Sequence, residues 1–231
     1  NYQNCKTLIE RLPESSIIIY REEDKKAKEL AKNAKAQTIE VPKQKQIALN
    51  VPGDFNQENA TLALALCKQL NIPEENALMA LAKFSGTWRR MEYKKLKNLE
   101  IQFIDDYAHH PTEVKATLKA IRSKHQEEKI LCVFQPHQYS RTAKLLDEFA
   151  SSFSEVDKVI IPNIYAVRDS SEDLQSTSPE IFVAKINSNS NNAEFGEGIA
   201  RTAEKIKTSN YDLIVTMGAG DISSIYKLLE N

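Results

Sequence analysis

Short β-branched runs alternate with helix-like patterns along most of the chain, which is typical of an α/β fold with a mostly parallel sheet. Proline at positions 13 and 73 separates the first of these segments, because it ends or opens helices. The expected strands are residues 16–20, 37–41, 99–104, 130–134, 158–162, 181–186 and 213–217. The expected helices are residues 3–11, 25–35, 56–70, 74–84, 111–122, 142–153, 198–208 and 221–229.

Two polar stretches, residues 169–178 and 187–192, lack an apolar period and are expected to be surface loops. The first follows a predicted strand end, where open sheets bind ligands, so it could also cover a substrate. Both readings remain open from the sequence.

The predicted elements divide the chain into two parts. Residues 91–231 provide about five strands in a doubly wound arrangement, which is a normal domain size. Residues 1–84 hold roughly two or three strands and four helices, fewer than a complete domain needs. We therefore expect a partial domain over residues 1–86 and a complete Rossmann-like domain over residues 87–231.

Composition excludes several protein classes. The 231 residues are 41% hydrophobic and 27% charged, which suffices for a buried core and excludes compositional disorder. A formal charge of −1 gives no general attraction to nucleic acid, and no apolar run reaches the ~18–20 residues of a membrane span. The chain begins with neither Met nor a signal peptide, so we expect a cut or processed start. Cys5, Cys67 and Cys132 have no metal-type spacing and are expected to be buried thiols in a reducing cytosol.

Glycine is scarce, with 6 residues where average usage of ~7% would give roughly 16. The sequence contains no G-x-x-x-x-G-K-[ST] motif, so these residues carry no Walker phosphate loop. Any phosphate chemistry must depend on other groups.

The densest cluster of reactive side chains lies between a predicted strand and a predicted helix. It contains Asp105, Asp106, Tyr107, His109 and His110. A carboxylate at a strand end can accept from ribose hydroxyls and a helix N-terminus favours phosphate, so nucleotide binding fits best. Helix capping beside a solvated turn, or a zinc or iron site, are the alternatives.

A second cluster follows the predicted strand 130–134. His137, Ser140 and Arg141 are three donors at the start of a helix and could hold a carboxylate or a phosphate. The alternative is that Ser140 only caps the helix while Arg141 is solvated.

A third cluster, M-G-A-G-D-I-S over residues 217–223, resembles a dinucleotide loop but has Ser223 at the third glycine position. It predicts a close backbone approach with free amides. Because all three clusters follow parallel strands, we expect them to share one rim of the sheet. Arg89 and Arg90, after Gly86, are either solvated or a phosphate clamp in a cleft between domains.

These residues also match a known family over the whole chain. The motifs are P-G-D-F-N-Q-E-N (52–59), G-T-W-R-R (86–90), D-D-Y-A-H-H-P-T-E (105–113), F-Q-P-H-Q-Y-S-R-T (134–142), I-Y-A-V-R-D (164–169) and M-G-A-G-D-I (217–222). With them the chain resembles the Mur ligases of peptidoglycan synthesis, and most of all their alanine-adding members.

The resemblance implies a cytoplasmic, ATP-dependent amide-bond ligase that joins L-alanine to UDP-N-acetylmuramate through an acyl phosphate. It implies ATP and Mg²⁺, with the metal ligands mainly outside these residues, and neither a nucleic-acid partner nor membrane insertion. Residues 1–86 would be the C-terminal part of a central ATP-binding domain, and residues 87–231 the C-terminal ligase domain. Such a piece would be inactive alone.

The resemblance also assigns roles to individual residues. Arg90 and His109 would be catalytic. The nucleotide would be bound by Asn59, Arg89, Arg90, Asp106, Tyr107 and His109. The other substrates would be bound by His137, Tyr139, Arg141, Gly218, Gly220 and Asp221.

Two positions depart from the family pattern: members usually have His where Phe55 stands, and alanine-adding members commonly have Arg where Gln138 stands. Three alternatives therefore stay open: a related ligase that recycles murein tripeptide, a nucleotide-binding module without catalysis, and a metal-dependent hydrolase built on Asp106, His109 and His110.

Overall fold

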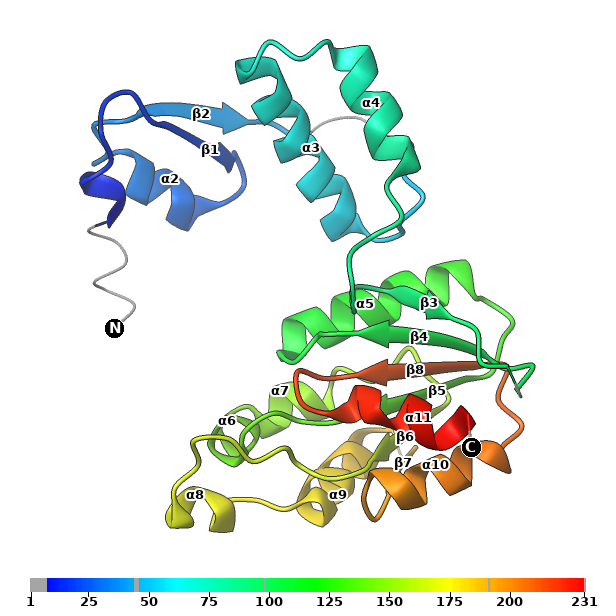
Figure 1. The fold of residues 1–231 in the computed structure, drawn as a ribbon. Helices are drawn as coiled ribbons and strands as arrows, with labels where there is room; N and C mark the ends of the chain where they lie inside the picture. The colour runs from blue at the N-terminus through cyan, green and yellow to red at the C-terminus, as the bar shows by residue number, and fades with distance from the viewer. Residues whose placement is uncertain (1–7, 44–45, 98, 191, 231) are drawn as a thin grey trace. The chain divides into compact units, whose positions relative to one another are not determined.

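The computed structural model describes residues 8–43, 46–97, 99–190 and 192–230, and the chain forms two compact units, Asn1–Ser85 and Gly86–Asn231 (Figure 1). Cys5 and most of the helix expected over residues 3–11 lie outside the described residues. Within the described part of the chain, no helix is long and apolar enough to cross a membrane.

The first unit contains a parallel two-stranded sheet and three helices of more than one turn. Strand β1 (Ile17–Arg21) pairs with β2 (Gln37–Val41), and α2 (Lys25–Ala31) connects them. Helices α3 (Asp54–Gln69) and α4 (Glu74–Lys83) follow. A small apolar core holds this unit together, made by Ile47, Ala60, Leu64 and Ala77.

The second unit is built on a six-stranded sheet in the order β3-β4-β8-β5-β6-β7. Its strands are β3 (Glu92–Lys94), β4 (Gln102–Asp106), β5 (Ile130–Phe134), β6 (Lys158–Ile161), β7 (Ala193–Phe195) and β8 (Leu213–Met217). All neighbouring strands are parallel except β3, which runs antiparallel to β4. The expected α/β class with a doubly wound, mostly parallel sheet is confirmed.

Helices cover both faces of this sheet (Figure 1). The helices described in the second unit are α5 (Pro111–Lys124), α6 (Tyr139–Lys144), α7 (Leu146–Ala150), α8 (Ser171–Gln175), α9 (Pro179–Asn189), α10 (Ile199–Lys207) and α11 (Ile225–Glu230), which follows the 3₁₀ turn η1 (Ile222–Ser224). One core joins the sheet to α10 and α11, while an aromatic cluster of Phe134, Phe149, Phe153 and Phe182 fills the other face. Every residue of β5 and β8 is buried, which is why both read as continuous apolar runs.

The strand expected over residues 181–186 is wrong, because this segment belongs to α9. Ser178 accepts from the amide of Ile181 at 3.2 Å and Pro179 opens the helix, so the start signals are those of a helix. Phe182 and Ile186, four residues apart, then share its buried face.

Several other helices and strands begin or end at residues other than those expected. The helix expected over 142–153 starts at Tyr139 and breaks at Leu145 into α6 and α7. The stretch expected as loop over 169–178 contains α8, opened by a capping box between Ser170 and Asp173. Half of the other polar stretch, 187–192, is also not loop: α9 continues to Asn189, and Asn191 lies outside the described residues. Strands β3 and β7 were missed because three residues are too few to show a period.

The expectation for the thiols holds for Cys132, which is fully buried and whose pKa is raised by burial. Cys67 is half-buried and also free.

Candidate functional site

The carboxyl ends of β4, β8 and β5 lie next to one another at one rim of the sheet, as expected from their parallel order. Backbone hydrogen bonds continue the sheet pairing beyond the strands. The amide of Gly218 donates to the backbone carbonyl oxygen of Asp106 at 3.1 Å, and the amide of Gln135 donates to that of Met217 at 2.9 Å. The three loops are therefore fastened together where they leave the sheet.

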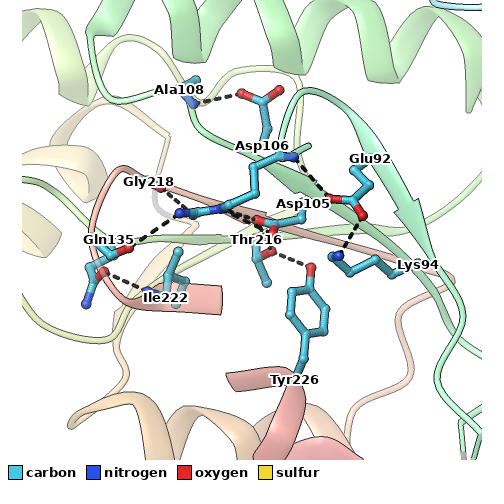
Figure 2. Close-up of polar contacts among 12 residues, drawn as sticks. Glu92, Lys94, Asp105, Asp106, Ala108, Gln135, Thr216, Gly218, Ile222 and Tyr226 are labelled. Carbon is cyan, nitrogen blue, oxygen red and sulfur yellow. Dashed lines mark hydrogen bonds and ion pairs between the residues drawn. The ribbon is translucent and has the colours of Figure 1, made fainter. Parts of the chain in front are cut away.

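Asp106 is committed to the backbone around it. Its Oδ1 accepts from the amide of Ala108 at 2.8 Å (Figure 2). Its Oδ2 accepts from the amide of Met91 at 2.9 Å, and the side chain is only 3% exposed. Burial raises the pKa of Asp106, against the opposing pull of those two amides. This carboxylate therefore shapes the loop after β4, whatever else it binds.

Tyr107 and His109 are the half-buried aromatic residues of the same loop. The Tyr107 ring has the Arg89 guanidinium 5.1 Å and the Arg90 guanidinium 5.6 Å from its centre. His109 Nδ1 is 3.1 Å from the carbonyl oxygen of Tyr107, and Glu113 accepts from the His109 amide at 3.0 Å. An aromatic ring flanked by two cations is suited to an anionic ligand that carries a planar group.

Arg89 and Arg90 differ although they are adjacent. Arg90 is exposed, whereas Arg89 is 3% exposed and has a left-handed backbone with φ of 52°. Arg89 donates from Nη2 to the carbonyl oxygen of Gly218 at 2.6 Å and from Nη1 to that of Gly220 at 3.4 Å. Its Nε lies 3.3 Å from Oδ2 of the Asp105 carboxylate. The guanidinium of Arg89 is thus used inside the unit, and Arg90 is the arginine that faces solvent.

On the loop after β5, His137 stacks on Tyr165 with ring centres 5.5 Å apart and an interplanar angle of 21°. Its Nδ1 is buried and has no hydrogen-bond partner among the described residues. Burial lowers the pKa of His137, and the positive charge of Arg141 lowers it further. The ring is therefore neutral near pH 7 and keeps one nitrogen available.

His109 and His137 join the two loops, since their ring centres are 6.4 Å apart and tilted by 68°. The candidate nucleotide loop after β4 and the candidate anion loop after β5 consequently meet at one place. Arg141 lies on α6 next to this pair, half-buried, and its side chain makes no hydrogen bond or ion pair with another residue in the described part of the chain.

The start of α6 is not the free anion site that the sequence suggested. Asp169 accepts from the amide of Ser140 at 3.2 Å and from its hydroxyl at 3.1 Å, and its other oxygen accepts from Val167 at 3.1 Å. Burial raises the pKa of Asp169, but these backbone donors outweigh it and the pKa is lowered. Ser140 lies within the helix and is not its cap. A carboxylate of the chain itself already occupies this end of the helix.

The glycine loop after β8 is defined by contact with Gln135. Gly218 has φ of 142°, and a Cβ there would collide with the carbonyl oxygen of Gln135. A Cβ on Gly220 would lie 2.5 Å from Gln135 Oε1. Gln135 also donates to Asp221 at 2.7 Å and accepts from the amide of Ile222 at 3.0 Å (Figure 2). The close backbone approach expected for this motif is present, and the Gln135 side chain occupies the space beside the two glycines.

The structure brings most of the proposed site residues to this rim. Gln135 and Asp169 were missed by sequence reasoning; the one available signal was a buried Gln directly after an apolar strand. Asn59 lies exposed on α3 of the first unit, and its role stays a prediction. The residues found on the rim are Arg89, Arg90, Asp106, Tyr107, His109, His137, Tyr139, Arg141, Gly218, Gly220 and Asp221.

The described residues contain no group of three or more His, Cys, Asp or Glu side chains that could hold a metal ion. The Asp106 oxygens accept backbone amides, and His110 caps α5 by accepting from Thr112 at 3.4 Å. A metal centre on Asp106, His109 and His110 therefore does not fit the geometry.

Comparisons with known proteins agree with this architecture. Residues 89–220 match the family described as "Mur ligase, glutamate ligase domain". The UDP-N-acetylmuramate–L-alanine ligase of Acetivibrio thermocellus is 44% identical over 182 residues, covering 78% of this chain and 38% of the relative. That of Fusobacterium nucleatum is 36% identical over 244 residues, covering 96% and 51%.

Solved structures show the same fold. A UDP-N-acetylmuramate–alanine ligase from Thermotoga maritima matches with a TM-score of 0.75 and 24% identity, over 99% of this chain and 53% of that one. A murein peptide ligase from Psychrobacter arcticus matches with a TM-score of 0.69 and 19% identity, over 98% and 53%. The chain thus spans from about two-fifths to about half of the length of these relatives.

Proposed function

The chain belongs to the Mur ligase family, and from this premise we propose that it acts within a cytoplasmic, ATP-dependent ligase that joins L-alanine to UDP-N-acetylmuramate in peptidoglycan biosynthesis. Two relatives of that name, 44% and 36% identical, support the choice of substrates. We assign residues 1–86 to the C-terminal part of a central ATP-binding domain and residues 87–231 to the C-terminal ligase domain.

One observation carries the proposal: His109 and His137, 6.4 Å apart, join the loop proposed for ATP to the loop proposed for the amino acid. A ligase must bring a phosphoryl donor and an amine to the same carboxylate. In this reaction a muramyl carboxylate oxygen bonds to the terminal phosphorus of ATP, and ADP leaves with the electrons of the broken P–O bond. The amine then attacks the acyl carbon, a C–N bond forms as the nitrogen loses a proton to solvent, and phosphate leaves with the C–O bond electrons.

On the ATP side we assign phosphate contact to Arg90, whose guanidinium is exposed beside Tyr107. Tyr107 would lie against the adenine, Asp106 would accept from the ribose, and His109 would contact the transferred phosphate. Arg89 would contribute indirectly, by holding the glycine loop through its buried contacts with Gly218 and Gly220. Asn59 would read the adenine edge with its amide.

On the amino-acid side we assign the carboxylate of alanine to Arg141, which has no protein partner in the described residues. His137 would hydrogen-bond the same group or the transferred phosphate through its available nitrogen. Tyr139, Gly218, Gly220 and Asp221 would border the pocket.

Magnesium would supply charge neutralisation at the phosphates. The described residues contain no group of three or more His, Cys, Asp or Glu side chains that could hold a metal ion, and no step here is assigned to the metal. We expect its ligands, with the phosphate loop, in sequence other than these 231 residues.

Phosphate release by the full-length gene product, with each substrate omitted in turn, tests the proposal. Release should require ATP, UDP-N-acetylmuramate and L-alanine together, and the 231-residue chain alone should release none. Nucleotide binding without turnover in the full-length protein would support the binding-module alternative.

Gln138 favours a second candidate substrate. Its amide donates to the carbonyl oxygen of Val167 at 3.1 Å, so this position adds no cation beside Arg141. A ligase that accepts murein tripeptide fits such a site, and the same assay with tripeptide in place of alanine distinguishes the two.

A further inference from the structure

A chain of buried polar contacts connects the C-terminal helix with the glycine loop (Figure 2). The hydroxyl of Tyr226 on α11 lies 2.6 Å from Thr216 Oγ1 on β8, and Thr216 donates to Asp105 Oδ1 on β4 at 3.2 Å. The same oxygen, Asp105 Oδ1, also accepts a hydrogen bond from Arg89 Nε at 3.4 Å. None of these four side chains is more than 8% exposed. We call Tyr226, Thr216, Asp105 and Arg89 the buried relay.

The direction of each bond follows from the donors available. An ionised Asp105 can only accept, so the single hydroxyl proton of Thr216 points to it. Thr216 must then accept from Tyr226, whose pKa is raised by burial and which stays protonated. Burial also raises the pKa of Asp105, and the Arg89 charge opposes this. The tyrosine proton therefore completes the hydrogen bonding of the pair that orients Arg89.

Arg89 transmits this orientation to the glycine loop. Its Nη2 and Nη1 reach the carbonyl oxygens of Gly218 and Gly220 at 2.6 and 3.4 Å. A guanidinium is planar, so fixing its Nε against Asp105 fixes the direction of both other nitrogens. The glycine loop has no side chain of its own at these two positions, which makes it dependent on that direction.

We propose that Tyr226 is a positioning residue, which holds Arg89 through Thr216 and Asp105 and so sets the glycine loop for the amino-acid substrate. The inference rests on the proposed function only in that the loop borders the substrate pocket. The Tyr226 ring itself packs edge-on against Phe103, with centres 5.9 Å apart. Tyr226→Phe therefore keeps the packing and removes only the hydroxyl.

Hydrogen exchange of the 231-residue chain tests the relay without any ligase activity. Tyr226→Phe, which loses one hydrogen bond, should speed exchange in residues 217–222 by about fivefold, and Thr216→Val, which loses two, should speed it at least as much. Thr216→Ser, which retains the hydroxyl, should exchange like the wild type. The control is Tyr93→Phe, which removes a hydroxyl bonded to His125 at 3.0 Å, away from the loop. Unchanged exchange in 217–222, or equal acceleration across residues 86–231, would overturn the proposal.

Kinetics of the full-length gene product test its consequence. Tyr226→Phe should raise the Michaelis constant for the amino acid by about fivefold and leave that for ATP within about twofold. Combining it with Thr216→Val should add little, because residues in one network are not additive. Equal effects on both substrates, or full additivity, would contradict the relay. A wild type without activity would refute the proposed function and leave the exchange result to judge the relay.

Discussion

Asp169 accepts hydrogen bonds from both the amide and the hydroxyl of Ser140, at 3.2 and 3.1 Å. The two residues are 29 positions apart, and their contact places the loop after β6 against the start of α6. It also uses the backbone donor that the sequence offered to a ligand. We expect binding of an external anion at this rim to depend on side chains, and the Arg141 guanidinium has no hydrogen-bond or ion-pair partner among the described residues.

Asp169→Ala should lower the free energy of unfolding by about 1 kcal/mol at pH 7, the usual value of a lost helix cap. The folded pKa of Asp169 lies below the ordinary 3.8, so its contribution is present above that value and is lost as the pH falls through the folded pKa. Urea unfolding at pH 7 and pH 3 measures this. The difference in the free energy of unfolding between wild type and variant should narrow at pH 3. The exposed Glu172→Ala is the control, and its free energy of unfolding should not differ from that of the wild type. An equal gap at both pH values would contradict the cap.

Arg141→Lys should impair the use of alanine far more than the use of ATP, by about 2 kcal/mol in kcat/KM, because lysine keeps the charge but loses the planar fork. Steady-state kinetics of the full-length gene product, varying each substrate in turn, provide the measurement. Lys144→Arg, in the same helix and exposed, is the matched control and should change neither. A loss confined to ATP would move Arg141 to the nucleotide site.

Asp106→Ala should raise the Michaelis constant for ATP by about tenfold or more, roughly 1.4 kcal/mol. It should also destabilise the second unit by about 1–3 kcal/mol, because the amides of Met91 and Ala108 lose their acceptor inside the protein. Kinetics and thermal unfolding separate the two effects. An unchanged Michaelis constant in a destabilised variant would leave Asp106 a purely structural residue.

Gly218→Ala should destabilise the chain by more than about 2 kcal/mol, since it combines an unfavourable φ with a collision against Gln135. Gly198→Ala is the matched control: its φ is 93°, but nothing lies within 4 Å of the added Cβ. It should cost only about 1 kcal/mol from the backbone alone. Urea unfolding compares the two, and equal losses would show that the Gln135 contact is easily relieved.

Helices and strands, which are formed by consecutive residues, could largely be predicted from the sequence. Strands β2, β5 and β8 match their expected ranges. For β5 and β8 the reason is that a fully buried parallel strand is apolar throughout. The β-branched residues of α9 gave the same pattern, and there Ser178 and Pro179 held the correct signal. Recognition of the rim followed from strand order, since parallel strands end together.

Contacts between distant loops could not be predicted in this way. Nothing local indicates that Asp169 reaches Ser140, or that Gln135 fills the space beside Gly218. The burial of Arg89 runs against the usual behaviour of arginine and depends on Asp105 and two glycine carbonyls meeting it. Adjacent arginines therefore looked alike in the sequence and differ in the structure.

The order of the sheet also matters while the protein is being made. The central strand β8, which separates β4 from β5, is the last of the six in the chain. Until residues 213–217 have left the ribosome, β4 and β5 have no common neighbour and keep open edges. The sheet consequently cannot close from its N-terminal side during synthesis. A nascent chain halted before β8 would leave one edge of β4 and one edge of β5 unpaired and open to other chains.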